Sequence, residues 1–308
     1  MPRSRLKFLA VPVALLIALC LAAVVLGASY TPNTAIPTGI PGRHVMVRGV
    51  PLRVVQSGQG RDVLLIHGSP GSIEDWDAVV DTLSASFHVT RFDRPGQGYS
   101  GDDGSYSYEH NAEMALGLIR ALGLSRVIVV GHSYGGATAL AMAVGNPAEV
   151  SAYVVVDSAT YESSRKPDGG MRLVDLPLVG YGFAALFSPI AKRRIQRGVA
   201  DQFEGSAPPG FVELRQRMWS TPKVLHAIAR ETIGAEDDLK GLSPKYPDIK
   251  APTYILAEAD SPFRKATAEH LHADVKGSSL RLIPNTGHYV QFQKPSEIID
   301  AVNAAAGS

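Results

Sequence analysis

The sequence predicts a doubly wound α/β fold, with a mostly parallel β-sheet and helices on both of its faces. Three observations support this prediction. Eight short β-rich runs follow one another along the chain, and helical patterns alternate with them from the third run onward. A long interval from Ser158 to about Tyr246 interrupts this alternation. Alternating strands and helices favour a parallel sheet with right-handed crossover connections.

The N-terminal part of the chain contains a long apolar segment. Three cations within the first seven residues precede an uncharged run, Phe8–Tyr30. About 20 apolar residues suffice to cross the hydrocarbon layer as a helix, whereas the apolar stretch of a secretory signal is shorter. We therefore expect residues 1–30 to form an uncleaved transmembrane anchor. The next cation is Arg43, which places the short tail in the cytoplasm and the rest of the chain outside. The alternative is a signal peptide that is cleaved, leaving a secreted or periplasmic protein.

The strands are predicted from apolar runs and turn residues. Residues 31–43 are rich in Pro, Gly and Thr, which is typical of a linker. His44–Arg48 and Leu52–Gln56 flank a glycine-containing turn and predict an antiparallel hairpin. Six further runs are mostly apolar, as expected of central strands covered on both faces. These runs are Asp62–Ile66, His88–Phe92, Arg126–Val130, Ala152–Val156, Thr253–Leu256 and Leu280–Ile283.

Helical patterns occupy the intervals between these strands. They cover Ile73–Ser84, Tyr108–Leu122, Tyr134–Val144, Ser261–Val275 and Pro295–Ala305. The interval 158–246 holds helix-like segments with aromatic residues, separated by Pro and Gly, and we expect it to form an inserted helical cap. The core domain then consists of residues 44–157 and 247–308.

Composition narrows the range of functions. The chain has 30 basic and 29 acidic residues, a net charge of +1, so its overall field attracts no nucleic acid and we expect no such partner. The one cysteine, Cys20, lies in the apolar N-terminal run. A thiol nucleophile, a cysteine-ligated metal and a disulfide are therefore excluded from the globular part. We expect neither a cofactor nor a metal, and a small molecule as substrate.

A serine lies at the centre of the segment GHSYG, residues 131–135, which joins a predicted strand to a predicted helix. A serine hydroxyl is a weak nucleophile and must be held exposed beside a base. A sharp strand-to-helix turn achieves this, and glycines on either side allow the turn to close. The start of the helix also offers N–H groups to a developing oxyanion. Ser133 is therefore the candidate nucleophile, and the N–H of Tyr134 is a candidate oxyanion donor.

A second loop, HGSPG at residues 67–71, ends an earlier strand. Such a loop can supply the other oxyanion N–H group, which we assign to Ser69. His67 is expected to support this loop and not to transfer protons.

The general base is expected late in the chain, in a loop after a strand. Of the nine histidines, three lie after residue 226. His270 and His272 fall inside a predicted helix, where i,i+2 neighbours point to different faces. His288 follows the strand Leu280–Ile283 and precedes a helix. It is therefore the candidate base.

Two aspartates are candidates for the acid that orients this histidine. Asp260 follows the strand Thr253–Leu256, and Asp157 follows the strand Ala152–Val156. Both lie where sites gather in open α/β sheets, and both fit the chain order Ser, Asp, His. We prefer Asp260 and keep Asp157 as the alternative.

From about Val50 to its end, the chain resembles the α/β-hydrolase superfamily, in the branch of serine hydrolases with a helical cap. The resemblance rests on four ordered motifs: HGSPG at 67–71, DRPGQGYS at 93–100, GHSYGG at 131–136 and TGH at 286–288. It implies that Asp260 is the acid, because the family acid follows Gly-x-x, although Ala257 stands here in place of that glycine. It assigns no catalytic role to the loop 93–100.

The resemblance implies a serine hydrolase. Relatives that open epoxides or displace halide carry a carboxylate where Ser133 stands, so hydrolysis of a carboxylic ester through an acyl-enzyme is the leading expectation. The aromatic residues of the cap suggest an apolar substrate of small or medium size. Carbon–carbon bond hydrolases and aminopeptidases of the same fold remain alternatives, because they share the triad. A non-catalytic ligand-binding protein is the alternative of another class.

Overall fold

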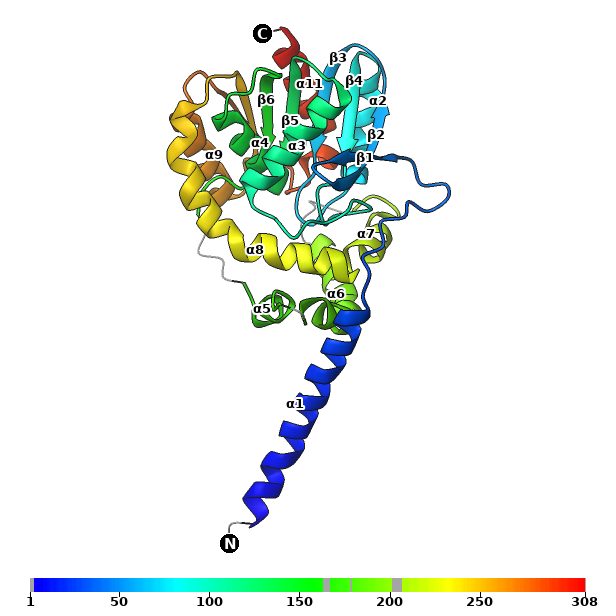
Figure 1. Cartoon of the computed structure of the whole chain (residues 1–308). Coiled ribbons are helices and arrows are strands. Elements are labelled where there is room, and N and C mark those ends of the chain that lie inside the picture. Colours follow the sequence, from blue (N-terminus) through cyan, green and yellow to red (C-terminus); the bar gives the residue numbers. More distant parts are fainter. Residues whose placement is uncertain (1–2, 163–166, 178, 201–206, 308) are drawn as a thin grey trace.

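The structure is a computed structural model that describes residues 3–162, 167–177, 179–200 and 207–307. An eight-stranded sheet lies at its centre, in the order β1-β2-β4-β3-β5-β6-β7-β8 (Figure 1). Strand β2 runs antiparallel to β1 and β4, and β4, β3 and β5 to β8 are mutually parallel. The predicted mostly parallel sheet is confirmed. The strands are β1 (Arg43–Val47), β2 (Val50–Ser57), β3 (Arg61–Ile66), β4 (Phe87–Phe92), β5 (Val127–His132), β6 (Val150–Val156), β7 (Thr253–Glu258) and β8 (Ser279–Ile283).

Helices cover both faces of the sheet, as the sequence predicts. One face packs on α2 and α11, and the other packs on α3, α4 and α9. Strand β5 is buried along its whole length, which explains why its sequence is an uninterrupted apolar run. The helices that cover the sheet are α2 (Asp77–Ser84), α3 (Tyr108–Leu122), α4 (Tyr134–Val144), α9 (Pro262–Asp274) and α11 (Pro295–Gly307), with a short α10 (Val290–Gln293) before the last.

Local capping residues explain where α3 begins and ends. The side chain of Ser107 accepts a hydrogen bond from the N–H of His110, and Gly123 ends the helix at a φ of 66°. Serine is a preferred N-cap, and glycine adopts the left-handed conformation without steric cost. Other bounds differ from prediction. Helix α2 is preceded by a 3₁₀ turn, Ile73–Trp76, and β7 continues two residues beyond its predicted end, to Glu258.

The described residues between β6 and β7 are helical or irregular, in agreement with the predicted helical interval 158–246. Within this interval, residues 163–166, 178 and 201–206 lie outside the described part of the chain. Figure 1 shows α8 running between the sheet and helices α5 and α6. The helices of this interval are α5 (Gly169–Val174), α6 (Gly180–Ala200), α7 (Phe211–Trp219) and α8 (Pro222–Leu242), followed by a 3₁₀ turn, Ser243–Asp248.

Helix α1 (Arg3–Ser29) extends away from the rest of the molecule (Figure 1). Its segment Pro12–Ser29 has a mean hydropathy of 2.5, and only 6% of it is buried. A helix of this length and composition fits either a membrane anchor or a signal sequence. Near its end, Ala23 is fully buried against α6. A Cβ atom on Gly182 of α6 would lie 1.8 Å from the carbonyl oxygen of Ala23, so only glycine permits this contact.

Candidate active site

Ser133 lies in a strained turn between β5 and α4. Its φ of 54° and ψ of −116° are unusual for a residue with a side chain. The neighbouring glycines make this turn possible. A Cβ atom on Gly131 would lie 2.2 Å from the carbonyl oxygen of Gly135, and one on Gly135 would lie 2.2 Å from the carbonyl oxygen of Ile66. The packing therefore holds the serine hydroxyl out of the sheet, in the position expected of a nucleophile.

The structure brings His288 to Ser133. Nε2 of His288 lies 3.1 Å from Oγ of Ser133, and Nδ1 lies 2.6 Å from Oδ2 of Asp157. Because a carboxylate only accepts hydrogen bonds, Nδ1–H donates to Asp157, and Nε2 is left to accept the proton of the serine hydroxyl. The three side chains form one hydrogen-bonded chain, which is the arrangement of a serine hydrolase triad.

The structure differs from the preference for Asp260, because His288 contacts Asp157 and Asp260 contacts another loop residue. The carboxylate of Asp260 accepts a hydrogen bond of 2.7 Å from the backbone N–H of Asn285, and its role is to hold that loop. Strand order explains the difference. Strand β6, which Asp157 follows directly, lies beside β5, whereas β7 lies one strand further from β5 and Ser133. Because β7 also continues to Glu258, Asp260 follows at a distance from the nucleophile.

Arg264 of α9 adds a positive charge beside the pair of His288 and Asp157. Its Nη1 lies 2.9 Å from Oδ2 of Asp157. Burial alone would raise the pKa of the Asp157 carboxyl, but His288 and Arg264 outweigh it, so this pKa lies below its usual value. Burial and the charge of Arg264 lower the pKa of His288 by more than Asp157 raises it. His288 is therefore neutral near pH 7 and able to accept a proton.

His132, inside the GHSYG segment, positions the base. Its Nε2–H donates to the carbonyl oxygen of His288 at 2.8 Å, and Nδ1 accepts from the side-chain amide of Gln291 at 3.3 Å. Burial and the neighbouring imidazole of His288 lower the pKa of His132 to about 3. A neutral His132 thus fixes the loop that carries the base. No local sequence pattern indicates this contact, which spans 156 positions.

The two residues expected to donate to an oxyanion lie on either side of this site. Tyr134 is the first residue of α4, where backbone N–H groups have no acceptor within the helix. Ser69 follows Gly68, and a Cβ atom on Gly68 would lie 3.2 Å from Cβ of Ser133. The loop after β3 therefore passes directly beside Ser133. Its use as an oxyanion donor stays a prediction.

His67 supports this loop, as expected. Its Nδ1–H donates to the carbonyl oxygen of Gly68 at 2.8 Å, and its Nε2 accepts from the backbone N–H of Arg94 at 2.9 Å. Burial and the charge of Arg94 lower the pKa of His67 well below its usual value. A buried, neutral histidine with both nitrogen atoms in use is a structural residue.

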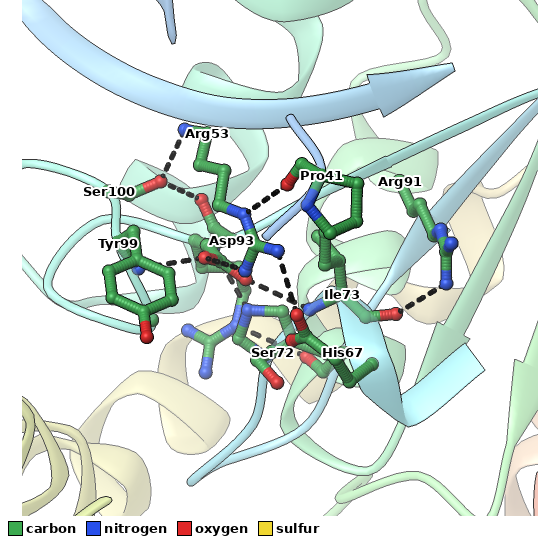
Figure 2. Close-up of polar contacts among 12 residues, drawn as sticks. Pro41, Arg53, His67, Ser72, Ile73, Arg91, Asp93, Tyr99 and Ser100 are labelled. Carbon is green, nitrogen blue, oxygen red and sulfur yellow. Dashed lines mark hydrogen bonds and ion pairs between the residues drawn. The ribbon is translucent and has the colours of Figure 1, made fainter. Parts of the chain in front are cut away.

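The loop 93–100 is also structural. Asp93 is fully buried and accepts hydrogen bonds from the backbone N–H groups of Ile73 (2.9 Å) and Tyr99 (2.8 Å). It also pairs with Arg53 at 3.3 Å. Figure 2 shows Asp93 at the centre of these contacts, with Ser100 beside it. Asp93 thus connects the loop to the start of the 3₁₀ turn. None of these hydrogen bonds and ion pairs involves Ser133, His288 or Asp157.

Glu231 of α8 connects the helical interval to the loops around the site, and the sequence did not single it out. This carboxylate is buried and pairs with Arg94 at 2.6 Å. It also accepts hydrogen bonds from Nε2 of Gln97 at 3.1 Å and from the hydroxyl of Ser69. Because 137 positions separate Arg94 from Glu231, no local pattern could have predicted this pair.

An apolar cavity of about 390 Å³ lies among α5, α6, α7 and α8, next to these loops. Two of its lining residues relate it to the site. Pro70 belongs to the loop that passes Ser133, and Trp219 packs in one cluster with Tyr289, the neighbour of His288. The apolar part of the lining includes Met171, Val174, Phe187, Ile190, Leu225 and Ile228.

A serine in a strand-to-helix turn above a mostly parallel sheet defines the α/β-hydrolase class of folds. The chain belongs to the α/β-hydrolase family, whose model matches residues 63–301. This family membership confirms the resemblance stated from the sequence motifs.

Relatives of the chain are hydrolases of several kinds. It is 28% identical over 280 residues to a 2-hydroxy-6-oxo-2,4-heptadienoate hydrolase of Pseudomonas putida, covering 85% of this chain and 95% of the relative. It is 26% identical over 254 residues to an esterase of Mycobacterium tuberculosis, covering 80% and 82%. The solved structure of an enol-lactonase from Burkholderia xenovorans shares the fold, with a TM-score of 0.66 at 19% identity, covering 86% of this chain and 100% of that one.

Proposed function

We propose that this hydrolase cleaves carboxylic esters through an acyl-enzyme, with Ser133 as nucleophile, His288 as general base and Asp157 as the orienting acid. The observation that carries the proposal is the hydrogen-bonded chain from Asp157 through His288 to Ser133. The relation to an esterase supports the ester as the bond cleaved.

The first half of the reaction forms the acyl-enzyme. Oγ of Ser133 attacks the ester carbonyl while Nε2 of His288 takes its proton, and Asp157 stabilises the imidazolium that results. The backbone N–H groups of Tyr134 and Ser69 donate to the carbonyl oxygen as it becomes negative. His288 then protonates the leaving alcohol. In the second half, water attacks the acyl-serine bond by the same steps and releases the acid.

Hydrolysis of a carbon–carbon bond is the second candidate. The substrate named for the Pseudomonas putida relative, 2-hydroxy-6-oxo-2,4-heptadienoate, contains no ester, so its hydrolysis breaks a carbon–carbon bond. That substrate carries a carboxylate, which proteins bind with a cation. Among the described residues that line the cavity, Arg194 is the one cation, and it pairs with Asp168 at 3.1 Å. An apolar ester therefore fits this cavity better.

The test is a panel of substrates offered to the full-length protein in detergent. We expect p-nitrophenyl esters of graded chain length to be hydrolysed faster than a 2-hydroxy-6-oxo-dienoate, and the reverse ranking would favour the second candidate. Ser133→Ala should lower ester turnover by at least about a thousandfold while the protein stays folded. Ser279→Ala, at an exposed position, is the matched control. Near wild-type turnover in Ser133→Ala would reject Ser133 as nucleophile.

We further propose that α1 remains attached as a membrane anchor, with the hydrolase outside the cytoplasm. The burial of Ala23 against α6 supports a retained helix, because cleavage near residue 29 would uncover that surface. Tyr30, which such a cleavage would leave in place, stacks on Tyr181 of α6 with a centroid distance of 5.1 Å, and its hydroxyl accepts a hydrogen bond from the backbone N–H of Lys223.

Two measurements test this location. The full-length protein should stay in membranes after a carbonate wash, and external protease should digest the hydrolase in intact spheroplasts. A soluble mature protein starting near residue 29 would mean that the segment is a cleaved signal. Digestion only after lysis would mean that the orientation is reversed.

A further inference from the structure

The contact between α1 and α6 lies within the apolar part of α1. On the N-terminal side of Ala23, the uncharged run Phe8–Ala22 has 15 residues. At 1.5 Å per residue it spans only about 22 Å. The hydrocarbon core of a bilayer is ~30 Å thick. A bilayer crossed by α1 must therefore reach past Ala23. Gly182, which contacts Ala23, then lies at the edge of the bilayer. The start of α6, to which Gly182 belongs, lies there too.

Exposed apolar side chains gather at this same end of the molecule. Leu173, Leu176 and Ile190 are 38%, 43% and 55% exposed. They belong to α5, to the segment that follows it and to α6, and we call them the α5–α6 face. Outside α1, the remaining exposed large apolar residues among those described are Met46 and Phe263. Figure 1 shows α5 and α6 where α1 leaves the body of the molecule.

Basic residues border the α5–α6 face. Helix α6 continues after Ile190 with a run of exposed cations, and α5 adds another beside Leu173. Apolar residues flanked by Lys and Arg are the composition of helices that lie in the interface of an anionic membrane, 5–10 Å deep. The exposed cations are Arg172, Lys192, Arg193, Arg194 and Arg197.

The apolar cavity joins this face to the site. Ile190 is 55% exposed on the α5–α6 face and also lines the cavity. At another point the cavity is lined by Pro70, in the loop that passes Ser133. An apolar chain entering at α6 therefore meets an apolar surface that extends from Ile190 to the loop beside Ser133.

We infer that the α5–α6 face rests on an anionic lipid bilayer, and that the substrate is an ester whose apolar chain enters the cavity from that bilayer. This inference rests on the proposed ester hydrolysis at Ser133. The acyl–oxygen bond of the lipid-embedded ester breaks, a bond from the acyl carbon to Oγ forms, and the proton of Ser133 passes through His288 to the released alcohol. Water then returns the acyl group as a free acid.

Fluorescence quenching tests the docking. In the full chain carrying Cys20→Ser, a fluorophore is attached through Leu173→Cys or Leu176→Cys, and the protein is placed in vesicles of phosphatidylcholine and phosphatidylglycerol containing a lipid-borne quencher. We expect a loss of fluorescence at both positions. Phe263→Cys, 57% exposed on α9, is the control and should keep its fluorescence. Equal quenching at all three positions, or none at Leu173 and Leu176, would overturn the inference.

Enzyme kinetics tests the delivery of substrate. The double variant Leu173→Asp with Leu176→Asp should lose at least about tenfold in kcat/KM toward a long-chain ester embedded in these vesicles, because the burial of two leucine side chains in lipid is lost. Its turnover of soluble p-nitrophenyl acetate should be unchanged, and Phe263→Asp should change neither. If the double variant hydrolyses the embedded ester like wild type, the bilayer is not the source. If wild type hydrolyses neither ester, the proposed function itself fails.

Discussion

Replacing Asp157 by asparagine is the sharpest perturbation of the site. Oδ1 of Asp157 accepts a hydrogen bond of 3.2 Å from the backbone N–H of Glu258, so an asparagine keeps its oxygen there. Its NH₂ group then takes the place of Oδ2, facing Nδ1 of His288 and Nη1 of Arg264. The Nδ1–H group of His288 and the new amide NH₂ group are both hydrogen-bond donors, so they cannot bond to each other. The imidazole avoids this by moving its proton to Nε2, the nitrogen that must accept from Ser133.

The cost follows from the loss of the correct tautomer. The same change in a well-studied serine protease lowers turnover by about ten-thousandfold. At 1.36 kcal/mol per factor of ten, this corresponds to about 5.5 kcal/mol of transition-state stabilisation. Asp260→Asn should cost less than about threefold, since its amide oxygen still accepts from the N–H of Asn285 and neither group touches His288.

The assay compares kcat/KM of the two variants on one p-nitrophenyl ester, with thermal denaturation to verify folding. We expect Asp157→Asn to be nearly inactive and Asp260→Asn to resemble wild type. A folded Asp157→Asn with high activity, or the opposite ranking, would refute the assignment of Asp157 as the acid.

Three further predictions address the surroundings of the triad. Arg264→Gln removes a charge that lowers the pKa of His288, so that pKa should rise and the acidic limb of the profile of kcat/KM against pH should move to higher pH; an unmoved limb would contradict this. Glu231→Gln leaves the buried guanidinium of Arg94 without its carboxylate, so denaturant unfolding should show a loss of about 3–5 kcal/mol, and a loss below about 1 kcal/mol would argue against the pair. Ala191→Phe fills the cavity, so the ratio of kcat/KM for long-chain over short-chain esters should fall; an unchanged ratio would separate the cavity from substrate binding.

Much of the fold follows from local sequence patterns. Helices α3 and α4 have the predicted bounds, Tyr108–Leu122 and Tyr134–Val144, because their first and last residues adjoin a serine or a glycine that sets the backbone. Ser133 and His288 can be predicted as site candidates for a similar reason. Each lies in a short segment whose type of connection, strand to helix or strand to loop, can be read from neighbouring residues.

The choice between the two candidate acids requires information that local sequence patterns do not contain. Asp157 and Asp260 both follow an apolar strand, and only the order of strands distinguishes them. That order results from long-range pairing, with β6 next to β5 and β7 next to β6. The contacts of Glu231 with Arg94 and of Ala23 with Gly182 escaped the sequence analysis for the same reason.

Covalent labelling tests the central claim, an activated serine at position 133, most directly. A fluorophosphonate reacts with a serine hydroxyl only when a neighbouring base activates it. We predict that the wild-type protein incorporates one label, that peptide mass spectrometry places it on Ser133, and that Ser133→Ala and His288→Ala remain unlabelled. A folded wild-type protein that takes no label, or a label on another residue that persists in Ser133→Ala, would contradict the account.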